Sequence, residues 1–83
     1  MHEMMIAESL LAAILEEAKK QGAKPINAKI SCGMLNTVND EILCFAFEAV
    51  AKGTACEGVK LEIEHKAKPD APLLLEEIEF ETG

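Results

Sequence analysis

The spacing of apolar residues switches repeatedly along the chain, between helical steps of three and four and strand-like steps of two. Residues 4–21 and 40–52 carry apolar side chains at helical spacing, which predicts two amphipathic helices. Residues 26–34, 58–65 and 73–81 alternate apolar and polar side chains, which predicts three half-buried strands. The expected element order is therefore α-β-α-β-β.

Several residues mark the ends of the predicted helices. Gly22 suits a left-handed C-terminal cap of the first helix, and Pro25 prevents its continuation. Asn39 is a favourable N-cap for the second helix, Asp40 begins an acidic first turn, and Gly53 ends the helix.

The same patterns predict which side chains face the core. The first strand should bury one alternating set and expose Asn27, Lys29 and Ser31; the buried set is Ile26, Ala28, Ile30, Cys32 and Met34. The second helix should bury a broad stripe: Leu43, Phe47 and Val50, widened by Ile42, Phe45 and Ala46. In the last strand the alternation slips at Glu76-Glu77, which predicts a β-bulge or a later strand start. The exposed sheet face should carry a row of acids: Glu62, Glu64, Glu77, Glu79 and Glu81.

Two amphipathic helices and three amphipathic strands predict an α+β two-layer sandwich, with both helices on one face of a three-stranded mixed sheet. A right-handed crossover through the second helix would make the first two strands parallel if they are adjacent. The turn at 66–72, with Pro69 and Pro72, predicts an antiparallel hairpin of the last two strands. With 83 residues, we expect a single domain, 1–83.

Composition narrows the function classes. A net charge of −7 disfavours nucleic acid and anionic membranes as partners. No apolar run reaches transmembrane length, and acids stand where a signal peptide needs bases, so we expect a cytoplasmic protein. Cys32, Cys44 and Cys56 form no CxxC pair, which favours reduced thiols packed as small hydrophobic residues. A redox-active or metal-binding thiol is the alternative.

No pattern in the sequence indicates catalysis. There is no glycine-rich phosphate loop, the two histidines are distant in sequence, and no carboxylate pair stands out. We therefore interpret the chain as a non-enzyme. His65 ends the second predicted strand, where a solvated histidine is the simpler interpretation and a second metal ligand beside His2 the alternative.

The N-terminus offers a metal-binding arrangement. Met1 supplies a free amine, His2 an imidazole, and the amide nitrogen of His2 lies between them. Ni(II) and Cu(II) favour four nitrogens in a plane and can displace an amide proton to obtain them. Glu3 can add its amide or its carboxylate. The alternative is an ordinary histidine in a terminal tail.

These opening residues also carry a resemblance. Met1-His2-Glu3, Ile6-Ala7 and Leu10-Leu11 resemble the start of the HypA/HybF family of hydrogenase (and urease) nickel incorporation proteins. The likeness continues in Gly22-Ala23, Gly33-Met34-Leu35 and residues 41–48, 52–54 and 57–64, and the last strand, 75–81, is similar too. The combination in this order is specific, although no single piece is.

The resemblance implies a metallochaperone that carries Ni(II) transiently to the large subunit of a [NiFe] hydrogenase, with a HypB-like GTPase as partner. It also implies two helices on a three-stranded sheet. His2 would be the nickel ligand, with Glu3 beside it in coordination or partner docking. A homodimer is a further assembly that this reading allows.

The chain departs from the family pattern in one region. Family members insert a zinc module with paired CxxC motifs between the second and third strands, where this sequence holds only the turn at about 66–72. No cysteine follows Cys56, so we expect no zinc. Three readings stay open: nickel delivery by His2, an interaction module that has lost metal delivery, and a chain from which the zinc module was excised.

Overall fold

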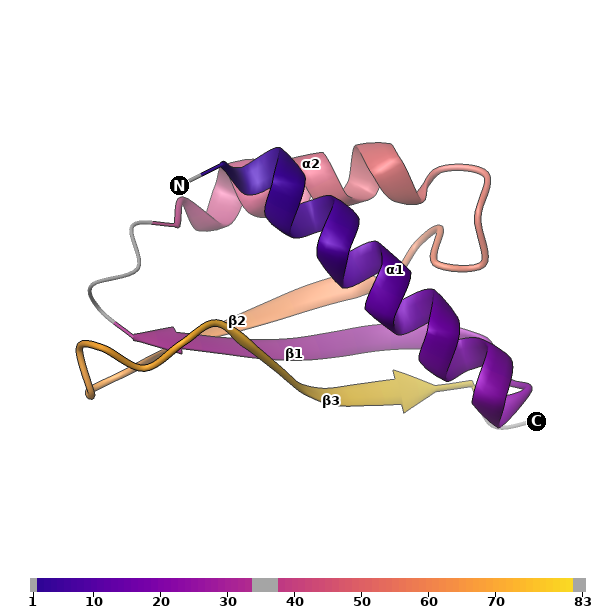
Figure 1. Cartoon of the computed structure of the whole chain (residues 1–83). Helices are drawn as coiled ribbons and strands as arrows, with labels where there is room; N and C mark the ends of the chain where they lie inside the picture. Colours follow the sequence, from indigo (N-terminus) through magenta and orange to yellow (C-terminus); the bar gives the residue numbers. More distant parts are fainter. Residues whose placement is uncertain (1, 34–37, 82–83) are drawn as a thin grey trace.

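The computed structural model describes residues 2–33 and 38–81. Two helices lie on one side of a three-stranded sheet, and α1 runs diagonally across it (Figure 1). The elements are α1 (Glu3–Gln21), β1 (Pro25–Gly33), α2 (Asp40–Ala51), β2 (Lys60–Lys66) and β3 (Leu74–Phe80). The predicted α+β class, element order and single-sided helix layer are confirmed. None of the helices described is long and apolar enough to cross a membrane.

Two predicted helix ends, at Gly22 and at Asn39, are confirmed by their caps, whereas α2 ends at Ala51 with Lys52 and not Gly53 as its C-cap. Gly22 adopts a left-handed backbone (φ 61°), and its N–H donates to the carbonyl of Ala18 at 2.9 Å. Such a cap satisfies a helix-end carbonyl that would otherwise lack a donor. At the start of α2 the Asn39 side chain accepts a hydrogen bond from the N–H of Ile42 at 3.0 Å. Asn39 is therefore the N-cap that the sequence indicated.

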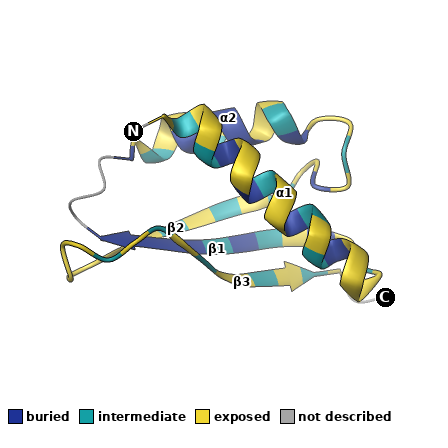
Figure 2. Ribbon diagram, viewed as in Figure 1, coloured by how far each residue is buried: buried dark blue, intermediate teal, exposed yellow. Residues whose placement is uncertain are grey.

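The strand order is β2-β1-β3, so the predicted hairpin of the last two strands is wrong. β1 pairs in parallel with β2, as the crossover rule predicted, and antiparallel with β3. The central strand is buried along most of its length between two more exposed neighbours (Figure 2). The most apolar strand is best placed in the centre of the sheet, where both of its edges are paired. The residues of the turn between β2 and β3 do not indicate which strand takes that place.

The connection between β2 and β3 passes over the end of β1 at Gly33. The Gly33 N–H donates to the carbonyl of Ala71 at 2.9 Å. A Cβ at Gly33 would lie 2.5 Å from the carbonyl oxygens of Lys68 and Pro69 and 2.7 Å from the amide nitrogen of Ala71. The turn at 66–72 thus needs a residue without a side chain beneath it.

The core lies between the helices and the sheet. Its largest fully buried apolar side chains include Phe47, Ile14, Ile30 and Leu43. Each contributes about 1.5–3 kcal/mol relative to an exposed side chain. The prediction for Ala28, Ile30 and Cys32 in β1 and for Leu43 and Phe47 in α2 is confirmed. Met34 lies outside the described residues.

Four predicted orientations are wrong. Ile42 and Phe45 are 53% and 75% exposed, because the stripe around Leu43 and Phe47 already fills the contact with α1 and the sheet. Ile26 is 40% exposed, since the register shifts between Pro25 and Asn27 and Pro25 is buried instead. Ser31 was expected on the solvent side but is buried on the central strand, between Glu64 and Leu74 of the flanking strands.

The expected bulge in the last strand is confirmed. Lys29 faces Glu77 and Ile30 faces Leu75, which leaves Glu76 as the extra residue in β3. The open sheet face carries exposed acids as predicted, with Lys29 of β1 opposite Glu62 and Glu77 in the flanking strands.

Candidate metal site at the N-terminus

The start of the chain lies beside the first turn of α2 (Figure 1). Met1, which would supply the amine, lies outside the described residues. His2 is exposed, with an extended backbone (φ −88°, ψ 100°), and its carbonyl accepts the N–H of Ile6 at 3.2 Å. His2 occupies the N-cap of α1, but its side chain makes no capping hydrogen bond. The imidazole is therefore not committed to holding the helix.

The Glu3 carboxylate is committed to α2. Its Oε2 accepts the N–H of Asn39 at 3.0 Å. Hydrogen bonds from the backbone N–H groups of Asn39 and of Glu3 itself lower the pKa of this carboxyl group. A metal that took the carboxylate would have to displace the Asn39 contact. The amide of Glu3 stands at the first helical position, where no preceding carbonyl of the helix can accept its proton.

The N-terminal residues face an apolar hollow of about 360 Å³. Its lining residues are His2, Glu3, Met4, Ile42, Phe45, Ala46 and Ala49. Phe45 is flanked along α2 by Glu41, four residues before it, and Glu48, three residues after it, and both are exposed. The candidate metal residues thus border an exposed apolar surface with an acidic edge.

A chain of polar contacts connects three elements near this site. His65 at the end of β2 places its Nε2 2.9 Å from both carboxylate oxygens of Asp40, the first residue of α2. Its Nδ1 lies 3.5 Å from the Sγ of Cys32 in β1. Sequence reasoning missed this arrangement. The parallel register that sets Cys32 opposite His65 was its only sequence-level signal, and it required knowing the strand pairing.

The three cysteines are free, as expected. Burial raises the pKa of each thiol, and the negative charge of Asp40 raises those of Cys32 and Cys44 further. Such thiols stay protonated and react poorly. Across residues 2–33 and 38–81, no three His, Cys, Asp or Glu side chains gather closely enough to hold a metal ion.

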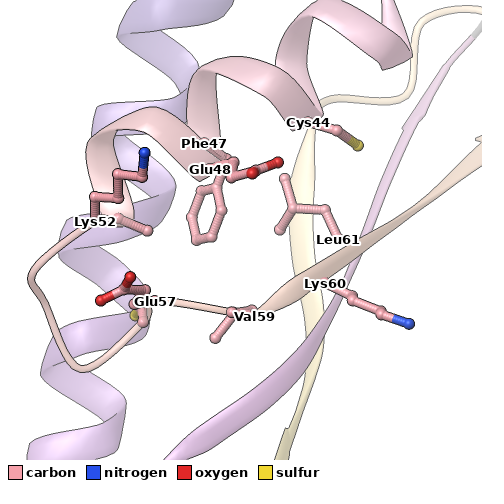
Figure 3. A pocket seen from close by; sticks show the side chains of 11 residues that line it. Cys44, Phe47, Glu48, Lys52, Glu57, Val59, Lys60 and Leu61 are labelled. Carbon is pink, nitrogen blue, oxygen red and sulfur yellow. The ribbon is translucent and has the colours of Figure 1, made fainter.

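A second depression of about 550 Å³ lies between α2 and the start of β2. Figure 3 shows Phe47 and Cys44 of α2 on one side of it, and Val59 and Leu61 at the start of β2 on the other. Two acids and two lysines edge it: Glu48, Glu57, Lys52 and Lys60. The charges balance and none converges on a single point, so the depression lacks the clustered donors of a metal site.

The fold has a counterpart among solved structures. It matches the solution structure of the Ni metallochaperone HypA from Helicobacter pylori with a TM-score of 0.70, covering 93% of this chain and 72% of that one at 24% identity. The family model described as hydrogenase/urease nickel incorporation, metallochaperone, hypA matches residues 1–69. The chain belongs to the HypA family, and the resemblance found in its sequence is confirmed.

Relatives named hydrogenase maturation factor HypA support the assignment. The one from Methanocaldococcus jannaschii is 41% identical over 70 residues, which cover 77% of this chain and 56% of the relative. The one from Aeromonas hydrophila is 37% identical over 68 residues, 81% of this chain and 60% of the relative. The chain thus spans little more than half the length of these relatives. The nickel ligands, the lack of zinc and the cytoplasmic location stay predictions.

Proposed function

We propose that this chain is a nickel metallochaperone, which binds Ni(II) at Met1-His2-Glu3 and passes it to a hydrogenase precursor. The observation that carries the proposal is the exposed, uncapped His2 directly after the terminal residue. Membership of a nickel-incorporation family supports the choice of metal. Nickel is cargo here, held transiently and then released.

The proposed ligands are nitrogens: the Met1 amine, the amide and imidazole of His2, and the amide of Glu3. Consecutive chain nitrogens close small chelate rings, which suits the planar geometry that Ni(II) adopts with such donors. Loss of two amide protons also cancels the charge of the cation near the positive end of α1. The Asn39 hydrogen bond favours the amide of Glu3 over its carboxylate as the ligand.

The proposed partners are a HypB-like GTPase and the large subunit of a [NiFe] hydrogenase. A protein that takes nickel from His2 must approach within bonding distance, and we expect it to cover the neighbouring Met4, Ile42 and Phe45. Because Glu41 and Glu48 edge this surface, a partner with basic residues around an apolar contact would fit it. A homodimer through this surface would oppose like charges.

Titration of the untagged protein with Ni(II) tests the metal role. We expect the yellow absorption of diamagnetic, square-planar nickel, and its loss in His2→Ala. A matched control carries an N-terminal tag, which removes the free amine of Met1 but keeps His2, and it should lose the planar signal as well. A parent protein without the band would contradict nickel delivery.

The exposed Phe45 and Ile42 favour a second function, a protein-interaction module without metal delivery. The two functions differ in one measurement. The interaction module would bind its partner with equal affinity with and without Ni(II) and after His2→Ala. A metallochaperone would bind or release its partner according to its nickel load.

A further inference from the structure

We propose that His65 is a positioning residue for the N-terminal nickel site. It acts through Asp40 on the adjoining Asn39, whose N–H holds the Glu3 carboxylate and with it the main chain of His2 and Glu3. The inference rests on the proposed function, because it concerns how the same nickel ligands are held. Nothing in the sequence placed His65 near the N-terminus.

The first step is the fixed orientation of the His65 ring. Nε2 meets both oxygens of Asp40 at 2.9 Å, and Nδ1 faces the sulfur of buried Cys32 at 3.5 Å. Because the ring is held at both nitrogens, it has little rotational freedom, and it can therefore fix the position of the Asp40 carboxylate. Because both ring nitrogens are occupied, His65 is a support and not a nickel ligand.

The second step is the rigid first turn of α2. Asp40 follows Asn39, whose side chain accepts the Ile42 N–H at 3.0 Å and whose carbonyl accepts the Leu43 N–H at 2.9 Å. Leu43 is fully buried in the core. His65 therefore joins the end of β2 to a turn that already has a well-defined shape.

The hydrogen bond between Asn39 and Glu3 connects this turn to the proposed nickel ligands. The Asn39 N–H donates to Glu3 at 3.0 Å, whereas α1 has no side-chain cap of its own at His2. This contact fixes the first turn of α1 against α2. Since two of the proposed nickel donors are the main-chain nitrogens of His2 and Glu3, their position decides how much ordering the metal must impose.

The test measures Ni(II) affinity of untagged variants by competition with a chromophoric chelator. We expect His65→Ala to bind Ni(II) about tenfold more weakly, the low end of losses seen when groups that orient metal ligands are removed. Asp40→Ala, which removes the carboxylate that His65 contacts, should show the same direction of change. It serves if His65→Ala folds poorly.

The matched control breaks an ion pair of similar exposure on the open sheet face. Lys29 and Glu64 lie 3.6 Å apart with side chains 44% and 48% exposed, against 41% and 46% for His65 and Asp40. Lys29→Ala breaks this pair and leaves Glu64, the chain neighbour of His65, in place, and it should leave Ni(II) affinity unchanged. If His65 had only a structural role, His65→Ala would lower the melting temperature but would bind Ni(II) as tightly as the control variant.

Double substitution separates transmission through Glu3 from other routes. Glu3→Ala keeps the amide but loses the Asn39 contact, whereas Glu3→Gln keeps an oxygen that can accept it. We expect weaker binding in Glu3→Ala, near-parent binding in Glu3→Gln, and no further loss when His65→Ala is added to Glu3→Ala.

Two results would overturn the inference. One is parent-like nickel affinity in His65→Ala. The other is a double variant, Glu3→Ala with His65→Ala, whose affinity falls by the product of the two single losses. Failure of the proposed function itself looks different, because the parent protein would then bind no nickel at all. Amide hydrogen exchange of the metal-free protein measures how well the Asn39 N–H is held by Glu3. His65→Ala should speed exchange at this N–H. An unchanged exchange rate there would also count against the inference.

Discussion

At the scale of single residues, Glu3 has an electrostatic role that can be measured without nickel. Hydrogen bonds lower the pKa of its carboxyl group in the folded chain from the ordinary value of 4.5. Its contribution to stability is therefore complete above pH 4.5 and is lost as pH falls through the lowered value. We expect Glu3→Gln to be less stable than the parent at pH 7, with the difference shrinking below pH 4.5.

Urea unfolding of both proteins at pH 7 and pH 3 checks this dependence. Glu8→Gln serves as the control, because Glu8 is exposed on the same helix. Its difference from the parent should change little between the two pH values. A Glu3→Gln penalty that grows on acidification would contradict the hydrogen bond from Asn39.

The three thiols should differ in reactivity. Cys32 and Cys56 are fully buried, and Cys44 is partly exposed on α2. Because the thiolate is the nucleophile and burial raises the pKa of all three thiols, alkylation of the folded protein should be slow and begin at Cys44. Mass spectrometry after iodoacetamide treatment locates the first site. Early modification of Cys32 would show that the contact with His65 opens readily.

At the scale of secondary-structure elements, the crossing of the 66–72 turn over β1 depends on Gly33. In Gly33→Ala the new Cβ would meet backbone atoms that cannot rotate away, the oxygens of Lys68 and Pro69. Overpacking of this kind costs about 1–3 kcal/mol. We expect a lower urea midpoint by a corresponding amount, with β3 the first strand to lose amide protection.

Gly22→Ala provides the comparison for Gly33. Gly22 has a left-handed backbone, but a Cβ there would meet nothing within 4 Å. Its penalty should therefore come from backbone strain alone, about 1–2 kcal/mol. If Gly33→Ala proves as stable as the parent, the turn does not rest on β1.

The elements themselves could be predicted from local patterns, but their pairing could not. Asn39 and Gly22 act within one turn of chain, so composition and spacing suffice to place them. The partner of β3 depends on β1, more than forty residues away, and on a turn that crosses a glycine. The hairpin prediction considered the turn residues Pro69 and Pro72 alone, and a tertiary contact at Gly33 overrode it.

At the scale of the whole molecule, the fold brings together residues that the sequence keeps apart. Met1, His2 and Glu3 could be proposed as a group from the sequence because they are consecutive. The link from Glu3 through Asn39 and Asp40 to His65 was not, since it depends on α1, α2 and β2 meeting at one end of the sandwich. Exposure of Phe45 likewise follows from how α2 packs, because helical spacing alone assigned this side chain to the core.

The surface around Phe45 leads to a prediction about nickel transfer. Phe45 is 75% exposed, so Phe45→Ser should change the free energy of unfolding by no more than about 0.5 kcal/mol. Nickel affinity should also stay unchanged, because the side chain contributes no ligand. Transfer of nickel to a hydrogenase large-subunit precursor from the same source should slow, since an exposed aromatic residue at the centre of a contact typically contributes most of its energy.

Leu74→Ser is the matched control, because Leu74 is 50% exposed in β3, at the opposite edge of the sheet from β2. It should transfer nickel at the parent rate. Equal rates for Phe45→Ser and the parent would separate the apolar surface from delivery, and the recipient would then reach His2 without covering α2. Slower nickel transfer by Phe45→Ser with unchanged Ni(II) affinity would instead place docking and metal binding on adjoining but distinct residues. A carrier needs this arrangement, because it must hold its cargo weakly and still release it to one recipient.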